Sequence, residues 1–121
     1  MVIARAASAV ATDPTSGSTY TANAAFGSGT AIGAGFVVYN GTGNSVNITG
    51  LSPDTTYHFA VYEYNNTGVC YNTTELTGNI LTNCAVPNTQ ATFGTITPTA
   101  TTASLAITAG NGAGRVVKIN T

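Results

Sequence analysis

Few residues of this chain have types and spacing suited to chemistry. His58 is the single histidine, and the alternation of its predicted strand places it on the outward side, where no serine or cysteine nucleophile can be assigned to it. Metal sites and catalytic triads need convergent partners. Asp13 and Asp54 are isolated in the sequence, so no calcium loop is visible. We therefore interpret His58 as an exposed strand residue.

Glu63 shares the inward parity of Tyr57, Phe59 and Val61. Because an unpaired carboxylate is costly to bury, we expect Glu63 at the end of its strand, in an ion pair with Arg5 on the neighbouring strand. No second carboxylate is placed to work with it in acid–base catalysis. The sequence thus predicts a structural pair, and no set of acid, base, nucleophile and metal ligand can be assembled for an enzyme.

The glycine-rich stretch at residues 27–33 lacks the Gly-Lys-Ser/Thr of a phosphate loop and does not open a helix. We interpret it as a flexible loop, and we expect no cofactor and no metal. Tyr20 and Phe26 lie in the long segment 7–35, where they could form a platform for stacking on sugars. Core and cross-strand packing is the commoner role of such rings, so carbohydrate binding remains the alternative interpretation.

Composition excludes several partners. Charged residues make up 6% of the 121 residues, against about 25% in a typical domain. The basic residues Arg5, Arg115 and Lys118 give no electrostatic footprint for nucleic acid or an anionic membrane. No apolar run approaches the roughly 18 residues of a membrane span. Residues 1–9 imitate a signal-peptide cleavage site, but their apolar run is too short for one, and we predict a strand there.

Period-two patterning, abundant β-branched residues and frequent glycines predict an all-β domain. In the long segment we expect residues 19–21 to pair briefly or to pack under the sheet. Residues 36–39 and 45–48 are expected to form a hairpin, because Asn-Gly and Gly-Asn between them favour a turn. The predicted strands cover residues 2–6, 36–39, 45–48, 56–64, 74–82, 91–96, 103–107 and 115–119.

The most informative stretch runs from residue 50 to 65. A Pro and an Asp turn the chain just before the strand at 56–64. Tyr57, at the first inward position, can bury its ring and return its hydroxyl to the backbone of the corner, as in Ig-like sandwiches. Leu51, Pro53, Thr55 and Tyr57 resemble the L-x-P-x-T-x-Y corner of fibronectin type III domains.

Further motifs extend this resemblance over most of the chain: Ala-Arg-Ala-Ala-Ser-Ala-Val at 4–10, Tyr-Thr-Ala-Asn-Ala-Ala-Phe-Gly-Ser-Gly-Thr at 20–30, Val-Val-Tyr-Asn-Gly-Thr-Gly-Asn-Ser-Val at 37–46 and Thr-Tyr-His-Phe-Ala-Val-Tyr-Glu-Tyr-Asn at 56–65. They resemble the fibronectin type III-like repeats of large secreted and cell-surface proteins of Bacteroidetes-type bacteria. The resemblance implies an Ig-like β-sandwich and an extracellular setting. Ile107 stands where the family usually carries Trp.

The strand order differs from that of the family. The resemblance implies that residues 1–83 supply strands C to G, residues 84–90 form a linker, and residues 91–121 supply strands A, B and a further C. One sheet of the sandwich then lacks strands, and its core face and one strand edge are open. Either the last segment folds back, giving a circular permutation, or it completes a neighbouring copy. We favour the neighbour, because the linker is short for the return, and we expect Leu105 and Ile107 to share one core with Val46, Ile48, Phe59 and Val61.

The function that this reading favours is a non-catalytic extracellular module, a repeat or subunit of a surface fibre or adhesin joined head to tail. Cys70 and Cys84 are expected at opposite poles of one sandwich, separated by a strand longer than the roughly 7 Å that a disulfide allows between Cα atoms. We therefore favour a disulfide between units. An ordinary bridge within the domain is the alternative, if strand 74–82 is broken early.

Overall fold

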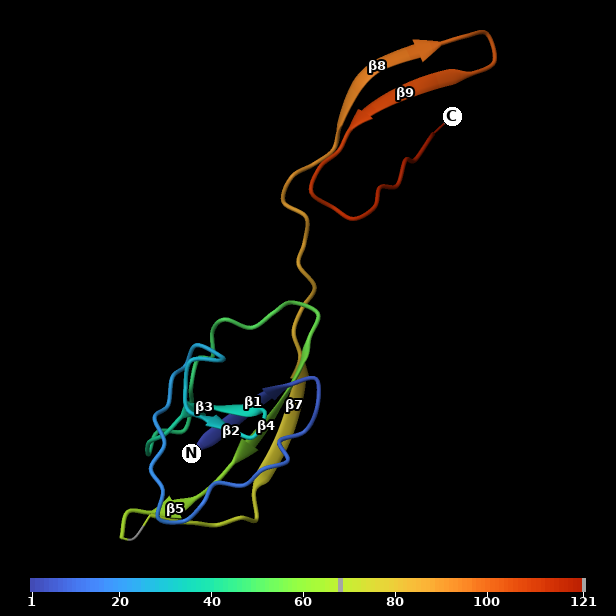
Figure 1. Ribbon diagram of the computed structural model, residues 1–121. Coiled ribbons are helices and arrows are strands. Elements are labelled where there is room, and N and C mark those ends of the chain that lie inside the picture. The colour runs from blue at the N-terminus through green and yellow to red at the C-terminus, as the bar shows by residue number, and fades with distance from the viewer. Residues whose placement is uncertain (68, 121) are drawn as a thin grey trace. The chain divides into compact units, whose positions relative to one another are not determined.

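The computed structural model describes residues 1–67 and 69–120 and divides the chain into two compact units, Met1–Cys84 and Ala85–Thr121. We call them the first unit and the hairpin unit. Every regular element in these described ranges is a β-strand, and the strands pair antiparallel (Figure 1). The fold is therefore all-β, with antiparallel sheets that are consistent with a β-sandwich.

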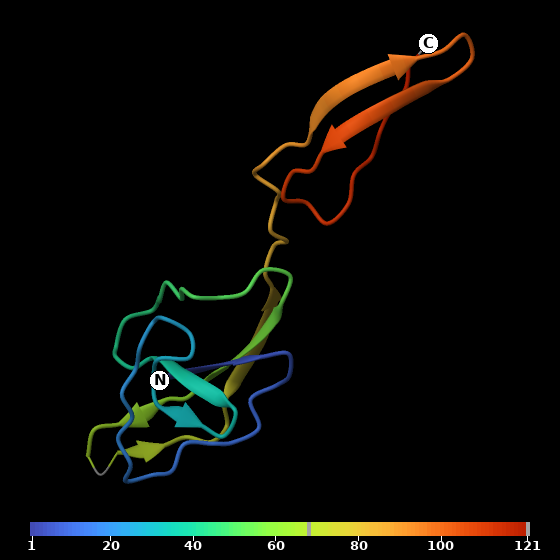
Figure 2. The same cartoon turned by 45° about the horizontal axis from the view of Figure 1, so that its top comes forward.

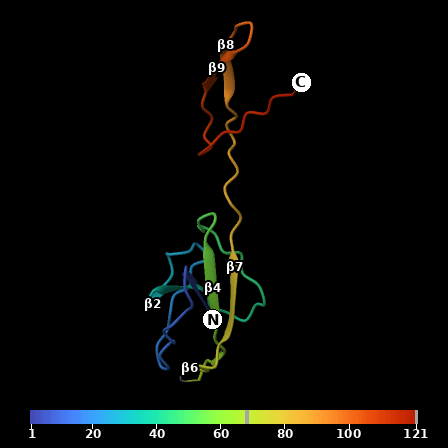
Figure 3. The ribbon, with the colours of Figure 1, turned by 90° about the vertical axis from the view of Figure 1, so that its right-hand side faces the viewer.

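A five-stranded sheet forms the centre of the first unit, in the order β2-β3-β1-β4-β7. Its strands are β1 (Val2–Ala6), β2 (Ala31–Ile32), β3 (Gly35–Tyr39), β4 (Thr56–Val61) and β7 (Leu76–Leu81). Figure 3 shows β4 and β7 side by side, as their continuous register requires. The short strands β5 (Tyr64–Asn65) and β6 (Cys70–Tyr71) form a separate two-stranded sheet.

Strand β4 has a buried residue on each of its faces. Tyr57 is 2% exposed on one face, whereas Ala60 and Tyr62 are fully buried on the other. The predicted inward position of Tyr57 is therefore confirmed, whereas the alternation that placed His58 outward wrongly implies that Ala60 and Tyr62 are outward as well. β1 and β3 carry apolar residues at nearly every position and so offer both faces for packing.

The main core cluster lies on the Ala60 face. It gathers buried residues from β1 to β4 and from β6, and partly buried residues of the long segment 7–35, among them Val10, Tyr20 and Ala22, pack against it. In Figure 2 this segment, coloured blue to cyan, passes around the sheet before it enters β2. The segment thus supplies the second layer on this face.

Backbone hydrogen bonds hold the long segment to the sheet. The Val37 N–H of β3 donates to the carbonyl of Thr30 at 2.9 Å, and the Asn23 N–H donates to the carbonyl of Val37 at 3.1 Å. The expectation that residues near 19–21 pair or pack under the sheet is confirmed, since Tyr20 also packs on the core cluster.

Residues 45–48 do not form the predicted strand or hairpin. Instead, Thr49 makes an isolated parallel bridge with Ala25. The N–H of Phe26 donates to the Thr49 carbonyl, and the N–H of Thr49 donates to the Ala24 carbonyl, both at 2.9 Å. Residues 24–26 of the long segment therefore pair with Thr49, in place of the predicted hairpin partner, and local sequence alone did not reveal this pairing.

The tyrosine corner that the sequence predicts is present. The Ser52 N–H donates to the hydroxyl of buried Tyr57 at 2.9 Å. Gly50 and Asp54 adopt positive φ angles of 72° and 51°, a conformation that Gly and Asp tolerate better than other residues. The corner thus reverses the chain sharply enough for Tyr57 to reach back to it.

The hairpin unit consists of β8 (Thr92–Pro98) and β9 (Ala103–Thr108), joined by a turn in which the Thr99 N–H donates to the Thr102 carbonyl at 2.7 Å. Phe93 pairs with Ile107 and Ile96 with Leu105, so the four large apolar side chains share one face. Residues 115–119 form no strand, contrary to the sequence-based expectation, because this segment lies across a cleft from Ile107 and not along an edge of the hairpin.

We expect Tyr57→Phe to lower the free energy of unfolding by roughly 1–3 kcal/mol, because the half-buried Ser52 N–H loses its acceptor. Urea denaturation followed by circular dichroism measures the change. Tyr39→Phe is the matched control: its hydroxyl also accepts a backbone N–H, from Gly43 at 2.6 Å, but in an exposed loop. Equal midpoints for Tyr57→Phe and the unmodified chain would contradict a structural role for the corner bond.

Candidate interaction surfaces

The residues considered for catalysis do not converge in the structure. His58 is half-buried on β4, in register with Arg5 of β1 on one side and Asn79 of β7 on the other. Within residues 1–67 and 69–120, no group of three or more His, Cys, Asp or Glu side chains is placed to hold a metal ion. The neighbours of His58 are thus the residues paired with it on the two adjacent strands.

The predicted ion pair between Arg5 and Glu63 is wrong. Arg5 lies opposite His58 in the β1–β4 register, whereas Glu63 follows the far end of β4 and is exposed. The Arg5 guanidinium instead donates to the carbonyl of Ala9 at 2.9 Å. Because β1 and β4 run antiparallel, Arg5 pairs near the start of β4 and cannot reach a residue beyond its end.

Buried Tyr62 and exposed Asp13 form a polar contact that the sequence did not predict. The Tyr62 hydroxyl donates to Asp13 Oδ1 at 3.0 Å. Burial raises the pKa of Tyr62 far above its ordinary value, and the hydrogen bond to Asp13 and the charges of Asp13 and Glu75 add to this rise. Burial likewise raises the pKa of Tyr71. The contact fixes the long segment to the end of β4.

Neither aromatic residue proposed as a sugar platform is free in the structure. The Tyr20 ring lies 5.9 Å from the Tyr71 ring, between centroids, and its hydroxyl accepts the N–H of Thr15. The Phe26 ring packs edge-on against Tyr57 at 4.9 Å and against Phe36 at 5.4 Å. Both rings are half-buried, and their contacts are structural.

Cys70 and Cys84 are exposed at opposite ends of the first unit. Cys70 pairs with Asn65 in the β5–β6 sheet, and its sulfur lies 4.0 Å from the Thr67 carbonyl oxygen. Cys84 follows Asn83, whose carbonyl accepts the N–H of Asp54 beside the corner. β7 lies unbroken between these ends and spans about 17 Å, too far for a bridge within the unit.

One face of the sheet is open where β4 meets β7. Tyr57 is paired with Ile80, Phe59 with Gly78, and Val61 with Leu76, and paired residues share a face. Leu76 is 73% and Ile80 57% exposed, and Phe59 and Val61 are half-buried. We call these four residues together with Gly78 the open face. Beside it, a cleft of about 660 Å³ lies between residues 41–46 and the ends of β1 and β4.

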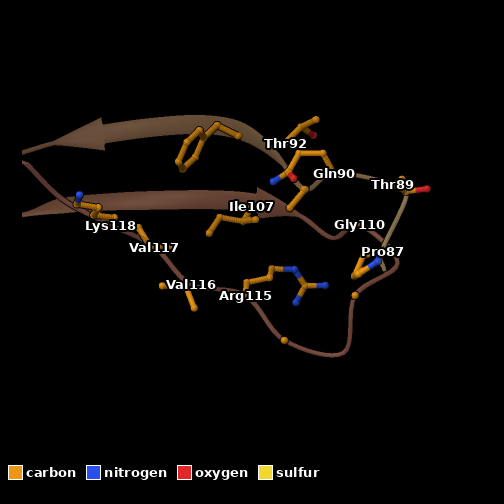
Figure 4. A pocket seen from close by; sticks show the side chains of 14 residues that line it. Pro87, Thr89, Gln90, Thr92, Ile107, Gly110, Arg115, Val116, Val117 and Lys118 are labelled. Atoms are coloured by element: carbon orange, nitrogen blue, oxygen red, sulfur yellow. The ribbon is translucent and has the colours of Figure 1, made fainter. Parts of the chain in front are cut away.

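The hairpin unit presents a second uncovered apolar surface. Its four large side chains are between 37% and 61% exposed. We call this surface, formed by Phe93, Ile96, Leu105 and Ile107, the hairpin face. A cleft of about 440 Å³ adjoins it, and Figure 4 shows Arg115, Val116 and Val117 on the segment that lies across this cleft from Ile107. Val116 and Ile119 are also highly exposed.

A two-stranded hairpin is at best marginally stable by itself in water. Its exposed apolar side chains therefore require a covering surface if the unit is to be stable. The expectation that Leu105 and Ile107 share a core with Phe59 and Val61 stays a prediction, because both sets are still partly exposed.

Comparison of the chain with protein-family models, with curated proteins and with solved structures gives no match. The part of the chain that the structure describes also contains no helix that could cross a membrane.

We expect the stability of the chain to fall as the pH rises above about 10. At lower pH Tyr62 is protonated in both the folded and the unfolded state; above about 10 the unfolded state releases the proton, whereas the folded state, with its raised pKa, retains it. Tyr62→Phe should make the decline between pH 9 and 11 shallower, with Tyr71 still contributing. Urea melts at each pH measure the slope, and an unchanged slope in Tyr62→Phe would contradict this assignment.

Proposed function

We propose that this chain is a non-catalytic structural module of fibronectin type III-like construction, a repeat or subunit of an extracellular surface fibre or adhesin joined head to tail. The observation that carries the proposal is the hairpin face, an apolar surface on a unit too small to bury it. Because each copy also carries an open face, the same association repeats from copy to copy. An association of two unlike surfaces that does not close on itself generates a filament.

The energetics favour copies held next to one another over freely diffusing ones. Covering a large apolar side chain completely contributes about 1.5–3 kcal/mol. Four roughly half-exposed side chains on each surface therefore supply on the order of 6–12 kcal/mol, which is similar to the cost of associating two free molecules, about 4–15 kcal/mol. A single contact is thus weak, and a covalent or continuous connection between copies would stabilise it.

The two cysteines suit such a connection. Cys84 leaves the first unit at the pole of the Tyr57 corner, and Cys70 lies at the opposite pole. In a head-to-tail array, the end of one copy that carries Cys84 faces the end of the next that carries Cys70. A disulfide between them would hold successive copies together in an oxidising, extracellular setting.

A carbohydrate-binding module is the alternative function. Its proposed platform, Tyr20 and Phe26, is occupied by packing against Tyr71, Tyr57 and Phe36. No observation favours this alternative over the structural module. The scarcity of charged residues supports a neutral extracellular spacer, whose polar surface comes from Thr, Ser and Asn.

We expect the purified chain to associate in a concentration-dependent way, with sedimentation velocity showing a series of species and electron microscopy showing short linear assemblies. A monomer at every concentration, together with glycan binding that is lost in Tyr20→Ala, would contradict the structural module and favour the alternative. Tyr39→Ala serves as the control for general effects of losing an aromatic side chain.

Oxidation should convert the assemblies into covalent multimers. Non-reducing electrophoresis is expected to show a ladder that collapses on reduction, and Cys84→Ser should stop the ladder at the dimer formed through Cys70. A monomer band that only shifts slightly in mobility would mean a disulfide within one copy and would refute the disulfide between copies.

A further inference from the structure

We propose that the open face of one copy is the docking site for the hairpin face of a second copy. This inference rests on the proposed function and adds the two surfaces that meet. It assigns the receiving residues to β4 and β7, and the inserted residues to β8 and β9.

The open face has large apolar side chains around a position that lacks a side chain. Along β7, two large side chains, Leu76 and Ile80, flank Gly78, and a side chain built at Gly78 would meet no atom within 4 Å. Phe59, paired with Gly78, is half-buried. The open space above Gly78 is therefore bounded by apolar side chains on three sides, and it suits an apolar side chain from another layer.

The hairpin face matches this surface in size and charge. β8 and β9 extend about 20 Å, as do β4 and β7, and stacked sheets pack about 10 Å apart. The open face carries no charged residue, because Arg5 and His58 belong to the opposite face of the sheet. β8 and β9 contain none at all. Docking of the strands would therefore bury apolar area without burying a charge, provided that Arg115 and Lys118, which line the adjoining cleft with Phe93 and Ile107, stay in water at the edge of the contact.

The size of the contact identifies a second copy as the occupant. The footprint of the hairpin is about 20 Å by 10–15 Å, roughly 300 Å², well below the roughly 800 Å² per partner of a stable interface. A freely diffusing protein would bind weakly to so small a site. A successive copy, held nearby by the chain or by the disulfide, binds at high effective concentration.

The connection within one copy is too short for the hairpin to cover its own open face in the expected orientation. The carbonyl of Asn83 accepts the N–H of Asp54, and Thr89 is tied to Asn111 by two hydrogen bonds, while the Asn111 side chain also donates to Asn88 Oδ1. Only residues 84–88 lie between these ties. Asn83 and Thr89 can then lie about 20 Å apart at most. In the strand order that the fibronectin type III resemblance implies, β8 runs in the direction of β7, and a return to its start and across the layer needs about 25 Å.

Photo-cross-linking tests this assignment on the full chain. A chain with Phe93→benzoylphenylalanine is mixed with a ¹⁵N-labelled unmodified chain at a concentration at which the unmodified chain forms assemblies. We expect cross-links from position 93 to ¹⁵N peptides that contain residues 56–62 or 76–81. Cross-links only to peptides without the label would mean that the hairpin covers its own copy, and cross-links elsewhere, or none, would refute the open face as the receiving site.

A charge placed over Gly78 gives an independent test. Gly78→Glu removes no side-chain contact of the first unit, and we expect it to weaken association at least tenfold in sedimentation equilibrium. Asn79→Glu is the matched control, because it adds the same charge on the opposite face of β7. If the unmodified chain does not associate at all, the proposed function fails. If it associates and both variants associate equally well, the head-to-tail module stands but this docking site is wrong.

Discussion

The pairing of β4 with β1 along one edge and with β7 along the other holds the first unit together. Because β4 lies between β1 and β7, it is paired along both edges, Tyr57 and Ala60 are buried on its two faces, and the Tyr57 corner fixes where it begins. The long segment can then cover the Ala60 face, tied near its start to the end of β4 by Asp13 and Tyr62. The opposite face is covered near β1 and β3 but is left open towards β7.

The low content of charged residues leaves the open face with few charged neighbours that would oppose association. In most soluble domains, charged residues around an apolar patch limit its association with other molecules. This chain has few of them, and β7 in addition offers the unpaired backbone groups of an edge strand. The open face and the hairpin face are therefore both apolar and uncharged, and burying them against each other removes apolar area from water. A function based on self-association follows more directly from these properties than one based on a ligand.

Much of the fold could be predicted from local pattern. β1, β3, β4, β7 and β9 follow from β-branched runs, and the corner follows from Leu51, Pro53 and Tyr57, because turn chemistry and strand patterning act over a few residues. What could not be predicted depends on distant partners. The inward position of Tyr57 was predicted correctly, but the outward position of Ala60 and Tyr62 was wrong, because the segment 7–35 covers that face. The strand at 45–48 failed because residues 24–26 pair with Thr49, and the Arg5–Glu63 pair failed because it depended on a register that no local signal specifies.

The strand order also determines how the first unit would respond to tension. β1 and β7 run parallel to each other, each antiparallel to β4, so Val2 lies at one end of the sheet and Leu81 at the other. A force pulling these two residues apart acts along the strands, and it loads the β1–β4 and β4–β7 hydrogen bonds together in shear rather than one after another. Rupture then requires many bonds to break at once. A module with this geometry resists stretching along its length far better than peeling from its β7 edge.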